Sequence, residues 1–150
     1  MKKFVFISLM MIWSISCKKK NNSSTTISEK MAVQNCYLYA KNKDTTAVSL
    51  TINGTFVSGK MHWNPYEKDG AVGTLKGTIK NDTIVAEYAY MIEGNNQLEE
   101  KVFVIKDENL QELFGDMTEL NGKMMIKNPK TAVVKNLLTK TSSCTYQFPN

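Results

Sequence analysis

The feature that most constrains the fold is a repeated combination of alternating residues and short polar turns. Residues 48–52 alternate between aliphatic and polar side chains, and Asn53-Gly54 follows directly. Alternation with a period of two is the pattern of a half-buried strand, and Asn-Gly favours a two-residue hairpin turn because both positions accept positive φ. A turn at these two residues pairs Leu50 with Val57 and keeps the apolar side chains on one face.

A second hairpin is predicted with its turn at Asn81-Asp82. This turn pairs Leu75 with Tyr88 and places Gly73 opposite the next aromatic residue of the strand. Glycines facing large rings are typical of a tightly curved sheet, because they leave room for the neighbouring side chains.

Further strands are expected at about 97–106, 110–117 and 123–127, separated by turns rich in Asn, Asp and Gly. The segment 129–135 fits either a helical turn or an irregular connection. A closing strand is expected over 137–146 and would contain Cys144. The fold class is therefore predicted as all-β, a single antiparallel, closed or nearly closed barrel of about eight or nine strands, because closure leaves no exposed edge. The alternative is a two-sheet β-sandwich.

The first 16 residues have the layout of a bacterial lipoprotein signal peptide. Lys2 and Lys3 precede an apolar run over 4–15, and small serines lead to Cys17, which cleavage would leave as an acylated N-terminus carrying lipid such as palmitate. An ordinary secretory signal also fits the charged start. A transmembrane helix needs about 20 apolar residues, and this run is shorter.

Residues 17–35 are predicted to form a flexible, lipid-anchored stalk, followed by one folded domain over 36–150. The stalk is polar, and its three lysines after Cys17 suit contact with acidic lipid headgroups. No Asp follows Cys17, so the expected location is the cell envelope, at the outer membrane facing the periplasm. In that oxidising compartment Cys36 and Cys144 are expected to form a disulfide, the alternative being two free thiols.

The net charge of +5 does not indicate nucleic-acid binding. Six of the 19 basic residues precede Cys36, and the remainder of the chain balances 13 lysines against 13 acidic residues. The chain also has no Arg, the residue best suited to phosphate and guanine contacts. We therefore expect no nucleic-acid partner.

The sequence resembles a group of small Gram-negative lipoproteins across most of its length. The resemblance lies in Cys17-Lys18-Lys19-Lys20, Cys36-Tyr37, residues 66–70 and 73–77, Asp82, Tyr88, Glu93-Gly94 and Cys144. That group has no established activity, so the resemblance implies an address rather than a function. The general plan is also similar to lipocalin-like barrels and to membrane-anchored lysozyme inhibitors, although their motifs do not occur in this chain.

Candidate catalytic groups are few, and we expect no enzyme, cofactor or metal site. His62 is the only histidine; the predicted register turns it away from the apolar face, toward solvent, and no Ser-His-Asp arrangement accompanies it. No second His or Cys lies at metal-ligand spacing. The acidic residues are interpreted as a solvated surface: Glu67, Asp69, Glu87, Glu93, Glu99, Glu100 and Glu112.

Aromatic residues give the candidate ligand site. Trp63 and Tyr66 flank the loop 64–70, and Tyr88 and Tyr90 alternate on one strand. Such rings could line the mouth of a barrel and bind a small apolar or sugar-like ligand, or they could pack its interior. The first hypothesis is thus a non-catalytic binding module tethered to a membrane.

The alternative hypothesis is a protein-interaction or inhibitor module that contacts an envelope protein through loops 64–70 and 93–96. A separate pattern, Asp-Thr followed by Thr or an aliphatic residue, resembles a bacterial O-glycosylation site and occurs at Thr45 and Thr83.

Overall fold

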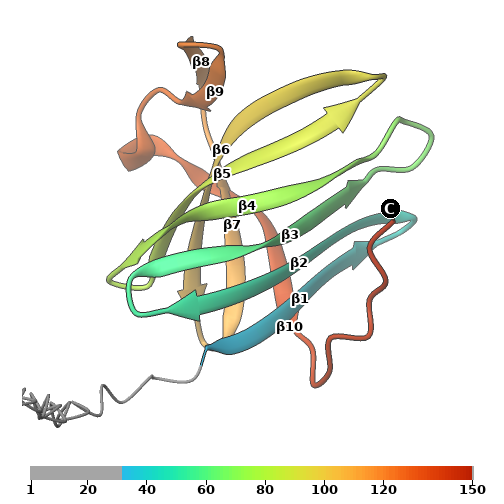
Figure 1. Ribbon diagram of the computed structural model, residues 1–150, viewed down its shortest axis with the longest axis vertical. Coiled ribbons are helices and arrows are strands. Elements are labelled where there is room, and N and C mark those ends of the chain that lie inside the picture. Colours follow the sequence, from blue (N-terminus) through green and yellow to red (C-terminus); the bar gives the residue numbers. More distant parts are fainter. Residues whose placement is uncertain (1–31, 150) are drawn as a thin grey trace, which may run out of the picture.

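The computed structural model describes residues 32–149, and these form an antiparallel β-barrel (Figure 1). The predicted signal peptide, Cys17 and most of the predicted stalk lie outside the described residues. The strands are β1 (Val33–Lys41), β2 (Asp44–Asn53), β3 (Phe56–Asn64), β4 (Ala71–Lys80), β5 (Thr83–Ile92), β6 (Asn95–Lys106), β7 (Asn109–Phe114), β8 (Met117–Leu120), β9 (Lys123–Ile126) and β10 (Val133–Lys140). One short 3-10 helix, η1 (Pro129–Thr131), leads from β9 to β10. Within the described part of the chain, no helix has the length and apolar character needed to cross a membrane.

Eight strands close the barrel in the order β5-β4-β3-β2-β1-β10-β7-β6, and pairing of β5 with β6 completes the circle. The two remaining strands, β8 and β9, form a hairpin that joins β6 through a short parallel contact. The prediction of a closed antiparallel barrel is therefore confirmed, and the alternative of a two-sheet sandwich is wrong. Figure 1 shows the β8–β9 hairpin standing apart from the barrel wall.

The two predicted hairpins differ in how well their registers agree with the structure. At Asn81-Asp82 the register is confirmed, with Leu75 paired to Tyr88, and both turn residues have positive φ. The other turn forms at Gly54 and Thr55 rather than at Asn53-Gly54, so Leu50 pairs with Gly59 instead of Val57. The partners shift by two residues, and the predicted inward face is therefore preserved.

Tight curvature of the wall depends on glycines that face backbone of the next strand. A Cβ atom at Gly73 would lie 2.2 Å from the Ala89 carbonyl oxygen, and one at Gly59 would lie 1.9 Å from that of Ser49. No side chain fits in such a space. The strands approach closely at these points because the sequence supplies glycine.

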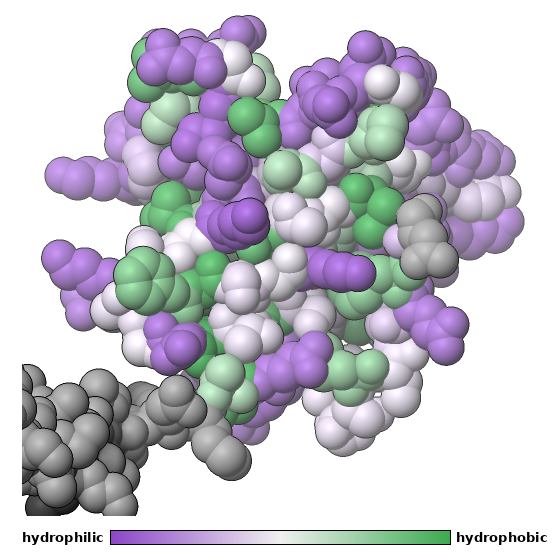
Figure 2. Space-filling model, viewed as in Figure 1, coloured by the Kyte–Doolittle hydropathy of each residue, from purple (hydrophilic) through white to green (hydrophobic). Residues whose placement is uncertain are grey.

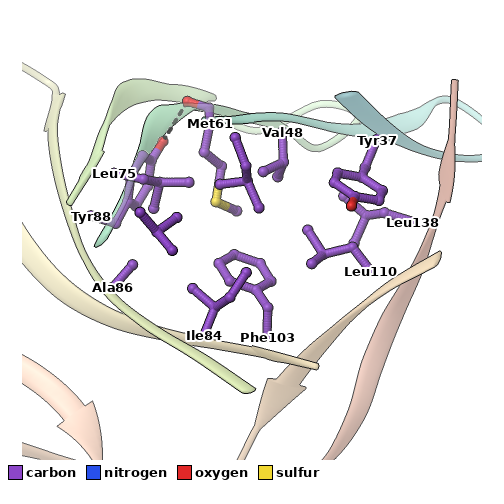
Figure 3. Close-up of a cluster of buried hydrophobic side chains, with 12 residues drawn as sticks. Tyr37, Val48, Met61, Leu75, Ile84, Ala86, Tyr88, Phe103, Leu110 and Leu138 are labelled. Atoms are coloured by element: carbon purple, nitrogen blue, oxygen red, sulfur yellow. Dashed lines mark hydrogen bonds between the residues drawn. The ribbon is translucent and has the colours of Figure 1, made fainter. Parts of the chain in front are cut away.

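The larger part of the barrel interior is filled by its own side chains (Figure 3). Met61, Leu75, Ile84, Phe103 and Leu110 are fully buried there and contact residues from other strands around the barrel. Burial of this apolar surface is the main stabilising term, and the closeness of the side chains leaves no space for an apolar ligand in this part of the interior.

The C-terminal region corrects two predictions. The expected strand 110–117 is interrupted at Gly115 and Asp116, where β7 gives way to β8, and the expected closing strand 137–146 ends at Lys140. Residues 141–149 form an irregular tail that runs along the outside of the barrel and ends near the β1–β2 turn (Figure 1). The Cys36–Cys144 disulfide is present. It joins β1 to this tail, not to a last strand, because Cys144 follows the end of β10.

Candidate functional site

Near one end of the barrel interior, the apolar packing is replaced by charged residues. Along β6, Phe103 and Lys101 both point inward, since residues two apart share one face, and Glu99 follows on the same face. Neighbouring strands contribute Glu112 from β7 and Asn136 from β10, which are paired in register. The interior of this end is therefore polar.

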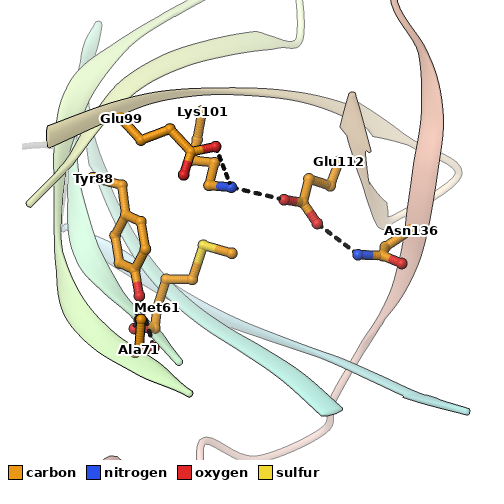
Figure 4. A network of polar contacts seen from close by, with 7 residues as sticks. All are labelled: Met61, Ala71, Tyr88, Glu99, Lys101, Glu112 and Asn136. Carbon is orange, nitrogen blue, oxygen red and sulfur yellow. Dashed lines mark hydrogen bonds and ion pairs between the residues drawn. The ribbon is translucent and has the colours of Figure 1, made fainter. Parts of the chain in front are cut away.

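These four side chains form one hydrogen-bonded network (Figure 4). The Lys101 ammonium lies 2.8 Å from Glu99 Oε1 and 3.3 Å from Glu112 Oε1. The Asn136 side-chain amide donates to Glu112 Oε2 at 2.7 Å. Glu112 is only 2 % exposed, so this carboxylate depends on the protein and not on water for its partners.

The electrostatics of the network favour charged Lys101. Burial alone would lower the pKa of the Lys101 ammonium, but the carboxylates of Glu112 and Glu99 outweigh this effect and raise the pKa. Lys101 therefore remains a cation at neutral pH. Every buried side-chain polar atom in the described part of the chain has a hydrogen-bond partner.

Aromatic rings form the wall next to this network. Tyr88 and Tyr90 stack with ring centroids 4.6 Å apart. The Tyr88 hydroxyl donates to backbone carbonyls of β3 and β4, those of Met61 and Ala71 (Figure 4). Burial raises the pKa of the Tyr88 phenol strongly, so this hydroxyl stays protonated. Burial, and then Glu99, also raise the pKa of Tyr90.

A small cavity of about 90 Å³ lies between the aromatic wall and the charged network. Its lining residues are Trp63, Ala71, Tyr88, Tyr90, Glu99, Lys101 and Lys135. Binding sites for whole drug-sized ligands span about 300–1,000 Å³. The cavity therefore has room for one end of a ligand, with the remainder outside the barrel.

The structure brings together three of the four predicted ligand-binding residues. Trp63, Tyr88 and Tyr90 line the cavity, whereas Tyr66 does not. The Tyr66 ring is exposed in the β3–β4 loop, where Lys43 donates to its hydroxyl at 2.8 Å and lies 4.0 Å from the ring centroid. Asp44 Oδ1 accepts a hydrogen bond from the Tyr66 backbone N–H at 2.7 Å, which fixes the loop against the start of β2.

The expectation that His62 faces solvent is wrong in one respect. Its side chain does point out of the barrel, opposite Ala47, but the C-terminal tail lies over it. The His62 ring nitrogen Nδ1 forms a hydrogen bond with the Tyr146 hydroxyl, and burial lowers the pKa of the imidazole. Between this tail and strands β1–β3 lies a groove of about 620 Å³, bordered by the disulfide.

The interpretation of all acidic residues as surface groups is also wrong, because Glu99 and Glu112 lie inside. The signal was in the sequence: a turn at Glu93-Gly94 pairs Tyr88 with Glu99, and cross-strand partners share a face. Any side chain opposite an inward tyrosine must itself point inward. Glu112 then follows, because it pairs with Phe103.

No group of three or more His, Cys, Asp or Glu side chains among residues 32–149 is arranged to hold a metal ion. The threonines of the proposed glycosylation pattern lie at strand ends: Thr45 near the start of β2 and Thr83 as the first residue of β5. Their modification stays a prediction.

Comparison with known proteins gave no match: the chain matches no protein-family model, no curated protein sequence and no solved structure.

The face of the barrel seen in Figure 2 mixes hydrophobic and hydrophilic residues without one broad apolar area. On this face, no broad apolar area competes with the interior cavity as a candidate ligand site.

Proposed function

We propose that this protein is a non-catalytic binding module of the cell envelope, anchored to the membrane through lipid on Cys17, with a ligand site at the polar end of the barrel. The anchor is supported by the sequence layout of residues 1–16, and the resemblance to Gram-negative lipoproteins supports an outer-membrane location facing the periplasm. The ligand class follows from the interior.

The observation that carries the ligand proposal is the aromatic wall facing a charged network across the 90 Å³ cavity. Replacing a buried ion pair with apolar residues is often neutral or stabilising, so fold stability does not require Glu112 and Lys101. Rings beside carboxylates and amides suit a hydroxylated ligand, because C–H faces stack on the rings while hydroxyl groups donate and accept. We therefore propose a sugar-like group, inserted end-first beside Trp63 and Tyr90.

An apolar ligand inside the barrel is a weaker proposal. A fatty chain would have to displace the packed side chains of the core, and each displaced residue would lose its van der Waals contacts. An apolar group in the polar cavity would also shield Glu99 and Lys101 from water, and this desolvation costs free energy.

The ligand proposal is tested by fluorescence. A chain that begins at Ala32 contains every described strand and retains Trp63 as its single tryptophan, so emission reports on the cavity wall. Titration with neutral and N-acetylated monosaccharides should shift this emission. Tyr90→Ala and Glu99→Gln should each weaken binding about tenfold or more, whereas Met91→Ala, on the outer face of the same strand, should not. No shift with any sugar in the panel would remove the proposal.

The anchor has a separate test. Full-length protein made in cells fed radiolabelled palmitate should carry the label, and Cys17→Ser should abolish it. An unlabelled wild-type chain would refute lipidation without affecting the ligand proposal.

A protein partner is the second candidate function, and one observation favours it. The β3–β4 loop lies beside the β5–β6 turn, where Asp69, Val72, Met91 and Glu93 border an open depression. Met91 is exposed there, and the loop is fixed by its contacts with Lys43 and Asp44. Cross-linking in envelope preparations should then yield one adduct that Met91→Lys removes and that Glu99→Gln leaves unchanged; sensitivity to Glu99→Gln instead would contradict a loop-mediated contact.

A further inference from the structure

A second surface, distinct from the cavity and the loops, surrounds the connection between β9 and β10. We define the η1 surface by the residues Phe114, Lys127, Lys130, Val133 and Lys135. Val133 pairs with Phe114 in register, and the Lys135 ammonium lies 5.0 Å from the Phe114 ring centroid. Lys127 is brought to the same place by its backbone bond to the Asp116 carbonyl, 2.8 Å long.

The apolar residues of the η1 surface are unusually exposed. Val133 is 65 % exposed and Phe114 44 %. Single exposed apolar residues are ordinary, but neighbouring ones rimmed by polar groups mark an interaction site. Figure 1 places η1 on the side of the molecule away from the C-terminus, so the tail does not cover it.

The charge of this region has one sign. After Glu119 the chain carries five lysines and no acidic residue. Lys123 and Lys140 contact Glu87 and Glu108, whereas Lys127, Lys130 and Lys135 take part in no ion pair among the described residues. The β9–β10 connection, residues 127–132, contains two lysines and no acidic residue, and Asp116 of the neighbouring β7–β8 connection leaves the η1 surface with a net positive charge.

We infer that the η1 surface docks on an anionic lipid membrane, with its lysines at the headgroups and Phe114 and Val133 in the interface. Exposed aromatic and aliphatic residues next to lysines are the combination that binds such surfaces, through apolar burial and electrostatic attraction together. A membrane surface offers both, with anionic headgroups above an apolar layer.

The choice of a membrane as the occupant rests on the proposed anchor at Cys17. The segment between Cys17 and Val33 could span at most about 58 Å if fully extended, so an acylated chain would hold the barrel close to the bilayer. The barrel strands are about 30 Å long, and every side of the molecule is therefore within reach of that surface. Because Lys135 borders both the η1 surface and the cavity, docking would also turn the ligand site toward the headgroup layer.

The test uses the chain that begins at Ala32, which retains the whole barrel and lacks both Cys17 and the lysines beside it. Vesicle flotation compares pure phosphatidylcholine with a mixture containing one-third phosphatidylglycerol. Binding should occur on the anionic vesicles alone and weaken at high salt, because screening reduces the attraction of exposed lysines.

Matched variants separate a specific surface from general charge. Lys127→Gln with Lys130→Gln should lower vesicle partitioning about 30-fold, since each lysine near the surface contributes about fivefold. Lys76→Gln with Lys80→Gln removes the same charge from the exposed face of β4 and should change it less than twofold. Val133→Ser should weaken binding at any salt concentration.

Two results would overturn the inference: no binding to anionic vesicles, or equal losses in the two lysine pairs. Palmitate labelling of the full-length chain tests the lipid anchor separately, so neither flotation result would refute lipidation of Cys17. Failure of labelling would refute the anchor, but it would not alter vesicle binding by the chain that begins at Ala32, which lacks Cys17.

Discussion

Replacing Lys101 with methionine should destabilise the barrel strongly, because it leaves a buried carboxylate without its cation. Lys101 contacts both Glu99 and Glu112, whose side chains are 20 % and 3 % exposed. Water can solvate Glu99 after the change, but it cannot reach Glu112, which would keep Asn136 as its one side-chain partner. Removing one member of a buried pair costs about 3–5 kcal/mol.

The assay is urea unfolding at pH 7, followed by the emission of Trp63 in the chain that begins at Ala32. In a thermal melt of a domain of this size, the same loss of 3–5 kcal/mol would lower Tm by roughly 10–20 °C. The raised pKa of Lys101 means that its ion pairs persist at neutral pH, and their stabilisation is lost only as the pH rises above the ordinary value of 10.5. A buffer near pH 7 therefore measures the full effect.

Two further variants identify the cause. Lys101→Met combined with Glu112→Gln removes the uncompensated charge, and it should recover most of the lost free energy of unfolding. Lys123→Met removes a partly exposed lysine whose ammonium lies 3.7 Å from the Glu87 carboxylate, and it should cost less than about 1 kcal/mol. If Lys101→Met costs no more than Lys123→Met, or if Glu112→Gln gives no recovery, the network is not the buried ion cluster described here.

Three other changes test separate parts of the fold. Replacing Cys36 and Cys144 together with Ala should lower the free energy of unfolding by about 4–5 kcal/mol, because the disulfide closes a loop of 108 residues. Urea unfolding measures this loss, and an unchanged midpoint would contradict a stabilising disulfide. Tyr88→Phe should cost about 1–2 kcal/mol because the Met61 and Ala71 carbonyls lose the one hydroxyl that donates to them, and it should reduce the alkaline loss of stability. The sign follows from the raised pKa of the Tyr88 phenol, since stability falls as the pH rises above 10; equal alkaline unfolding in both proteins would refute this. Gly73→Ala should lower the free energy of unfolding by about 1–3 kcal/mol or more, because the added Cβ would clash with the Ala89 carbonyl oxygen. A thermal melt that coincides with that of the wild type would refute this, since it would show that the barrel wall can relax around the Cβ.

Much of the barrel could be predicted from the sequence, because turn chemistry and alternation agree locally. The Asn81-Asp82 turn fixed its register correctly, since both residues adopt the positive φ that this two-residue turn needs. At Asn53-Gly54 only Gly54 has positive φ, with a value of 61°, and it takes the first turn position, so the strand extends by one residue. A dipeptide identifies a turn, but the position of that turn along the chain depends on the partner strand.

The parts that could not be predicted depend on contacts between distant segments. Pairing of β1 with β10 and the path of the tail over β1–β3 arise from packing across the whole chain, and local periodicity does not encode them. The sequence predicts a closing strand over 137–146 that contains Cys144, yet the strand ends at Lys140. Glu99 is a different case, since the Glu93-Gly94 turn and the inward tyrosine together already determined its position.

The polar end of the barrel and the η1 surface have a common physical basis. An eight-stranded barrel can fill its interior with apolar side chains, and this chain does so around Phe103 and Leu110. Toward the end where Lys135 lies, it places Glu112 and Lys101 inside and exposed lysines outside, two arrangements that apolar packing alone would not produce. Buried charges cost desolvation energy and exposed valines gain nothing from folding, so both features are better explained by contacts outside the chain. Under the proposed docking, a single orientation satisfies both, in which the cavity and the η1 surface face the lipid headgroups.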